Sequence, residues 1–77
     1  MSQIFFRKDH EDVRTVRYSF GDDHEHFTRT LTVTKEQNRY VADDGSEDRV
    51  FRKAAWGIAG RFRQSGQWPD RGSHTSG

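Results

Sequence analysis

Apolar and polar residues alternate along the first half of the chain, and the pattern then changes to a helical period. Residues 27–34 alternate most regularly: threonines occupy one face, and the other holds Phe27, Arg29, Leu31 and Val33. A period of two predicts a half-buried β-strand. Residues 13–20 alternate in the same way, so the two segments are predicted to form a hairpin across the polar turn 21–26.

Two shorter segments extend this predicted sheet. Residues 39–42 follow the turn 35–38 and are predicted to be the third strand of a meander. Residues 4–8 form an apolar run followed by cations, which predicts a first edge strand ending in a turn at residues 10–12. The sheet is therefore expected to have three or four antiparallel strands.

Residues 46–64 carry the helical pattern. Ser46 is the predicted N-cap, with Glu47 and Asp48 in the first turn, and the helix is expected to end near Gly66. At about 100° per residue, one apolar arc collects Val50, Phe51, Ala54, Ala55, Ile58 and Phe62. Gly57 and Gly60 each weaken the helix by about 1 kcal/mol relative to alanine. Their presence predicts that something approaches the helix backbone closely.

These elements predict an α+β fold in which one C-terminal helix packs on one face of the sheet. The apolar arc of the helix is expected to cover Tyr18, Phe20, Leu31 and Val33. Residues 1–70 then form a single β-β-β-α domain, with Trp68 folded back onto the core. The composition of residues 71–77 is typical of a disordered tail.

Composition limits the size of the core. Only 30% of the 77 residues are hydrophobic, so a homodimer that hides aromatic surface is one expectation for this chain. Cysteine is absent, and no apolar run has the length of a transmembrane span or a signal-peptide core. The sequence therefore predicts a cytoplasmic protein that does not bind membranes.

A cluster of acids and histidines in the turn 21–26 offers metal or acid–base chemistry. His24 and His26 could point the same way, but a closed metal site needs further ligands from elsewhere in the chain. The sequence supplies no accompanying nucleophile or glycine-rich phosphate loop. A solvated acidic turn is therefore the prediction, with no metal, no cofactor and no enzymatic activity.

The formal charge is only +1, but the two signs are segregated along the chain. Residues 49–71 hold six cations and one acid, whereas residues 9–25 hold six acids and two cations. On the helix, the polar arc surrounds Trp56 with Arg49, Arg52, Lys53 and Arg63. Such a surface favours nucleic acid, because cations bind phosphates and an indole stacks on bases. Alternatively, one of residues 4–6 or a second subunit covers the indole.

The order of elements also resembles the C-terminal two-thirds of a double-stranded-RNA-binding domain. The residues that carry this resemblance are Gly21, His24, the strand 27–33, Gly45, Ser46, Ala54 and Ala55. In that family, lysines after the serine hold phosphates, whereas this chain has Glu47 and Asp48. Carboxylates there would repel RNA. The family's first helix has no counterpart, since residues 1–12 are predicted to be strand and turn.

A three-stranded sheet with one helix is also similar to the integrase-arm and AP2-type DNA-binding domains. That resemblance implies a sheet lying in the major groove. Arg17, Arg29, Arg39 and the threonine face, which includes Thr28, Thr30 and Thr32, would then contact DNA.

The sequence therefore predicts a small non-enzymatic nucleic-acid-binding or regulatory domain that works through the helix face or the sheet face. The alternative is a protein-interaction module, dimeric or a phage or mobile-element accessory protein, in which Trp56 forms a buried contact. The sequence does not distinguish DNA from RNA or from a protein partner.

Overall fold

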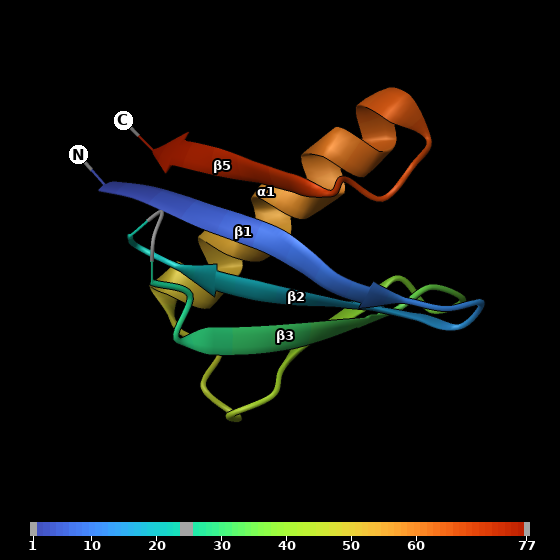
Figure 1. Cartoon of the computed structure of the whole chain (residues 1–77), viewed down its shortest axis with the longest axis horizontal. Helices are drawn as coiled ribbons and strands as arrows, with labels where there is room; N and C mark the ends of the chain where they lie inside the picture. Colours follow the sequence, from blue (N-terminus) through green and yellow to red (C-terminus); the bar gives the residue numbers. More distant parts are fainter. Residues whose placement is uncertain (1, 24–25, 77) are drawn as a thin grey trace.

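In the computed structural model, five antiparallel strands form one sheet and a single helix packs against it (Figure 1). The structure describes residues 2–23 and 26–76. In chain order the elements are β1 (Ser2–Glu11), β2 (Thr15–Gly21), β3 (Arg29–Thr34), β4 (Arg39–Ala42), α1 (Arg49–Ser65) and β5 (Arg71–Ser76). The α+β class is as predicted, but the sheet has five strands and not three or four.

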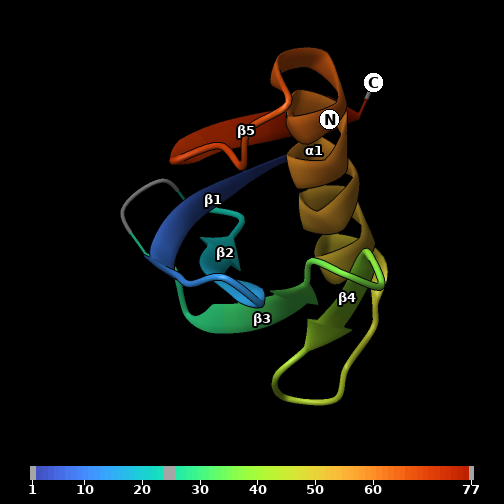
Figure 2. The same ribbon diagram turned by 90° about the vertical axis from the view of Figure 1, so that its right-hand side faces the viewer.

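The strand order across the sheet is β4-β3-β2-β1-β5. The first four strands form a meander, and α1 then carries the chain from the β4 edge to the β5 edge (Figure 2). The helix covers one face of the sheet during this crossing. The opposite face has no covering element among the described residues.

The register of the strands explains the core. Phe6 lies opposite Phe20, and Tyr18 lies opposite Leu31, so their side chains share the face that meets the helix. The helix adds its apolar residues to the same cluster. The sheet contributes these fully or almost fully buried apolar side chains: Ile4, Phe6, Val16, Tyr18, Phe20, Leu31, Val33 and Ala42. The predicted burial of Tyr18, Phe20, Leu31 and Val33 under the helix is confirmed.

The helix begins two residues later than predicted. Asp48, and not Ser46, is the N-cap, and its carboxylate accepts a hydrogen bond from the Phe51 N–H. The predicted end is confirmed: Gly66 adopts the left-handed conformation, and its N–H donates to the Phe62 carbonyl. No helix among the described residues is both long and apolar enough to cross a membrane.

Strand β1 is longer and more central than the predicted edge strand. It continues through His10 and Glu11, which were predicted to form a turn, and it pairs with β2 on one side and β5 on the other. The turn follows it instead. The Asp12 carboxylate accepts hydrogen bonds from the N–H groups of Arg14 and Thr15 and so closes the reversal of the chain. Val13, predicted to lie in a strand, is exposed in this turn.

The predicted disordered tail is the clearest error in the sequence prediction. Residues 71–76 form β5, which pairs antiparallel with residues 2–7 of β1. The segment RGSHTS has no apolar alternation, so its own sequence does not favour a strand. Its backbone hydrogen-bonds to a strand edge that would otherwise be unpaired, and this pairing determines its conformation.

The connection between α1 and β5 is held by aromatic packing. Trp68 stacks on Phe62 with ring centroids 4.1 Å apart, which confirms that it folds back toward the core. The buried Tyr18 hydroxyl donates to the Pro69 carbonyl at 2.7 Å. These contacts place the chain beside β1, where β5 begins.

The two helix glycines differ in their surroundings. A Cβ atom added at Gly57 would lie 2.9 Å from His74 Cβ and 3.0 Å from Phe6 Cε2, so β5 and β1 do approach the helix here. A Cβ atom added at Gly60 would meet nothing within 4 Å. The predicted close approach is therefore confirmed at Gly57 and wrong at Gly60.

Candidate functional site

Four of the predicted helix residues lie together on the outer surface of α1. Arg49, Arg52, Lys53 and Trp56, called here the basic helix face, line one shallow hollow of about 330 Å³. Their spacing of three to four residues places them on adjacent turns. The Trp56 side chain is 70% exposed, although large aromatic side chains are normally buried. The helix thus presents an indole among three cations.

One alternative from the sequence was that a residue of the segment 4–6 covers the Trp56 indole. The structure does not show this coverage. Ile4 and Phe6 are buried in the core beneath the helix, on its other side. Phe5 lines a separate hollow together with Arg7. Within this chain, the contacts of the described residues agree with an exposed Trp56 platform and not with coverage of Trp56 by residues 4–6.

Arg49 and Arg52 differ from several other cations of the chain, which pair with carboxylates. Lys8 and Lys35 both pair with Glu11, at 2.7 and 2.8 Å. Within residues 2–23 and 26–76, neither Arg49 nor Arg52 has a carboxylate in ion-pairing range. Two guanidinium groups therefore remain available for an external anion beside Trp56.

Arg63 was predicted to belong to the same surface. It lies two turns further along α1 and lines a different hollow, together with Tyr40, Phe62 and Gly66. The structure therefore does not bring Arg63 into the cluster around Trp56.

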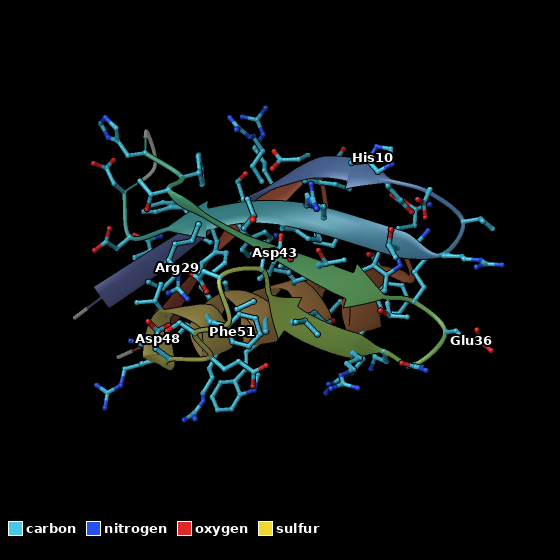
Figure 3. All side chains as sticks on the ribbon, turned by 90° about the horizontal axis from the view of Figure 1, so that it is seen from below. His10, Arg29, Glu36, Asp43, Asp48 and Phe51 are labelled. Atoms are coloured by element: carbon cyan, nitrogen blue, oxygen red, sulfur yellow. The ribbon has the colours of Figure 1, made fainter. Side chains whose placement is uncertain are left out.

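Arg29 was predicted as a reader of nucleic acid, but its guanidinium is engaged within the chain. Nε donates to Asp44 at 2.8 Å, Nη1 donates to Asp48 at 2.8 Å, and Nη2 donates to the Ser46 carbonyl at 2.6 Å. The guanidinium also lies over the Phe20 ring, 4.8 Å from its centroid. Figure 3 shows Arg29 and Asp48 at the same end of the molecule, with Phe51 nearby on the helix. Arg29 thus fastens the start of α1 to β3.

This arrangement affects two acids. Hydrogen bonds from Arg29 hold the pKa of Asp44 and of Asp48 below their ordinary value of 3.8, with smaller contributions from the N–H groups of Ser46 and Phe51. Because the pKa is depressed in the folded state, these groups stabilise the fold above the unfolded pKa. That stabilisation is lost as the pH falls through the folded-state values.

We therefore expect Arg29→Gln to lower stability at pH 7 and to reduce the loss of stability on acidification. The melting temperature, followed by circular dichroism between pH 7 and about pH 2.5, checks this, since the affected window lies below the ordinary carboxyl pKa. Arg14→Gln, at an exposed turn, serves as the control and should keep the wild-type profile. Parallel profiles for Arg29→Gln and the wild type would contradict the role assigned to Arg29.

The predicted sheet face is less suited to an anion than the basic helix face. Asp43 lies in its middle, accepting hydrogen bonds from the hydroxyls of Thr30 and Thr32 at 2.7 and 2.8 Å, and Arg17 lies 3.7 Å from the same carboxylate (Figure 3). Arg39 is exposed on β4, opposite Thr34. On this face, Arg17 thus lies beside a carboxylate to which Thr30 and Thr32 are hydrogen-bonded.

The acidic turn is described only in part. His24 and Glu25 lie outside the described residues, and His26 Nδ1 lies 3.2 Å from the Asp23 carboxylate. Among the residues that are described, no group of three metal-ligating side chains is found.

One group of cations was missed by sequence reasoning. Arg7, Arg61 and Arg71 line the same hollow beside β5, although they are far apart in the chain. Residue spacing could not have grouped them, because Arg71 had been assigned to a disordered tail. The cation-rich segment 49–71 includes Arg61 and Arg71, but nothing in the sequence places Arg7 beside them.

Comparisons with family models, with curated proteins and with solved structures give no match to this chain.

Proposed function

We propose that this protein binds single-stranded nucleic acid through the basic helix face. The observation that carries the proposal is the 70% exposure of Trp56 within a hollow lined by Arg49, Arg52 and Lys53. The resemblances to double-stranded-RNA-binding and sheet-in-groove domains rest on element order and do not involve this feature.

The chemistry of the four side chains supports that choice of ligand. An exposed indole can stack on an unpaired base of a single strand. A duplex keeps its bases inside its own stack, where the indole does not reach them. Guanidinium groups bind phosphate oxygens bidentately, and those of Arg49 and Arg52 lie next to the indole on the same helix surface. A strand with splayed bases can therefore contact the indole and the cations together.

The sheet face supports this ligand less well. A phosphate placed beside Arg17 would also approach Asp43, whose carboxylate already accepts hydrogen bonds from Thr30 and Thr32. Repulsion from that carboxylate would offset part of the attraction. On the basic helix face, no carboxylate of the described residues pairs with Arg49 or Arg52.

The test is fluorescence anisotropy with a labelled single strand of DNA, the same strand of RNA, and the two duplexes, at low and physiological salt. Phosphate contacts from Arg49 and Arg52 predict that log K falls with log salt at a slope of about −1.4 for a single strand. Trp56→Ala should weaken binding by roughly 10- to 100-fold, the range expected for one lost base-stacking contact. Tighter binding of DNA or of RNA then identifies the nucleic acid.

Arg52→Glu provides the electrostatic arm of the experiment, and Arg14→Glu is its matched control because both make the same change in net charge. Arg52→Glu should weaken binding of every sequence alike, and Arg14→Glu should have a smaller effect. Equal effects of the two substitutions would exclude a localised site on the helix. Absence of binding even at low salt would refute the proposal.

The protein-interaction alternative predicts a different mass and a different indole emission for the free protein. If a second copy or another protein covers Trp56, the mass should increase with concentration and the indole emission should shift to shorter wavelength. The mass and the emission spectrum of the free protein are therefore recorded before nucleic acid is added.

A further inference from the structure

A hollow of about 450 Å³ lies beside β5, away from the basic helix face. Four segments of the chain meet there: β1, residues 27–28 before β3, the last turns of α1, and β5. The described residues that line it are Phe5, Phe6, Arg7, Phe27, Arg61, Arg71, Gly72 and Ser73. Its volume is within the range of pockets that hold small molecules.

The hollow is strongly cationic. Arg7, Arg61 and Arg71 line it, and no carboxylate is among the described lining residues. In the described part of the chain, Arg61 and Arg71 have no ion pair, whereas Arg7 lies 3.5 Å from Asp9. Asp9 also accepts a hydrogen bond from Ser19, so its charge is shared between two partners. The three guanidinium groups thus leave a local excess of positive charge.

Arg61 is held at the hollow by a close approach to β5. A Cβ atom added at Gly72 would lie 2.5 Å from Arg61 Nε and 2.8 Å from Phe6 Cζ. A larger side chain at position 72 would displace the Arg61 guanidinium or the Phe6 ring. Arg61 of α1 therefore lies against β5, at the same hollow that Arg7 and Arg71 line.

The rest of the lining is aromatic. The guanidinium of Arg7 lies 4.9 Å from the centroid of the Phe27 ring, an arrangement that orients the cation without neutralising it. Phe5 and Phe27 are both partly exposed, so their rings offer apolar surface to a ligand. A ligand can thus place a flat apolar group against the rings and an anionic group against the guanidinium groups of the same hollow.

We propose that this hollow binds a small organic phosphate that carries a flat ring. Three converging guanidinium groups favour a doubly charged phosphate over a single carboxylate, because planar guanidinium groups pair with its oxygens. The rings of Phe5 and Phe27 add a stacking surface. Free nucleotides and phosphotyrosine both have this chemistry. The site shares no residue with the basic helix face, so it stands whether or not that face binds nucleic acid.

Amide chemical shifts, measured by NMR on the full chain, test the proposal with phenyl phosphate as the probe. The amides of Gly72 and Ser73 should shift and saturate, and phenyl phosphate should bind more tightly than inorganic phosphate, benzoate or benzyl alcohol. Unmoved amides would overturn the site, and equal affinity for inorganic phosphate would overturn the role of the ring. Titrations with adenosine monophosphate and O-phosphotyrosine then identify the source, and saturation by either one supports the shared chemistry.

Variants separate this site from general electrostatic attraction. Arg61→Gln and Arg71→Gln should each weaken phenyl phosphate binding about tenfold or more, the loss expected for one charge-assisted contact. Arg52→Gln, on the basic helix face, is the matched control and should leave that affinity unchanged. An equal loss in all three variants would overturn the assignment. The circular dichroism spectrum of each variant verifies that the fold is intact.

Discussion

Deletion of residues 71–77 is expected to destabilise the protein by about 3–5 kcal/mol, a large part of the stability of a domain of this size. The deletion removes β5, whose residues 71–76 pair with residues 2–7 of β1. It also exposes Ile4 and Phe6, which are 1% exposed in the intact chain. A disordered tail, which the sequence had predicted, could be removed without this cost.

The physical reason is that β1 would become an unprotected edge strand. Its free N–H and C=O groups would have to bind water or another chain, and a strand that carries Phe5 and Phe6 favours association with a second copy. The truncated chain should therefore unfold at lower urea concentration and should show an increased mass or aggregation at high concentration.

Urea unfolding followed by circular dichroism, together with the mass in solution, measures both effects. Full-length Arg71→Gln is the control, because it removes a β5 side-chain charge and leaves the backbone pairing with β1 intact. Its midpoint should stay close to that of the wild type. A truncated chain with the wild-type midpoint and a monomeric mass would show that β5 contributes nothing to stability.

Alanine substitutions at Gly57 and Gly60 are expected to have opposite effects. Both remove a helix glycine and so gain about 1 kcal/mol of helix propensity. At Gly60 nothing lies within 4 Å of the new methyl group, so Gly60→Ala should stabilise the protein by about that amount.

At Gly57 the new methyl group would meet His74 Cβ at 2.9 Å and the ring of Phe6 at 3.0 Å. Neither atom can move without shifting β5 or a buried ring, and such overpacking costs about 1–3 kcal/mol. Gly57→Ala should therefore be net destabilising. The two variants, each the control for the other, are compared by chemical denaturation. Stabilisation by both would mean that β5 packs less closely against α1 than the structure shows.

The hairpin and the core side of the sheet were predictable from the sequence. Apolar residues at every second position predict a strand, and the same residues form the face that packs against the helix. In the strand 29–34, Leu31 and Val33 face the helix, as their period of two requires. The predicted strand 39–42 agrees with β4 in both bounds. Arg29 was also placed correctly on the core side, but its role as an anchor for Asp44, Asp48 and the Ser46 carbonyl needed tertiary contacts between β3 and the start of the helix.

The sequence predicted the candidate site only for residues that lie close together on a single helix. Arg49, Arg52, Lys53 and Trp56 lie within eight residues of one helix, so helical periodicity alone places them on one surface. Arg63 has a compatible angle but lies two turns away, since angle around the helix axis does not give distance along it.

What the sequence determined by itself is therefore local: the hairpin, the third strand of the meander, the helix with its apolar and basic faces, and the left-handed Gly66 that ends it. The tertiary structure alone decided the position of β5, the close approach at Gly57 and the meeting of Arg7, Arg61 and Arg71. Periodicity describes which side chains of one element share a face. Strand β5 has no such pattern, and hydrogen bonding to the free edge of β1 determines its structure and brings distant arginines together.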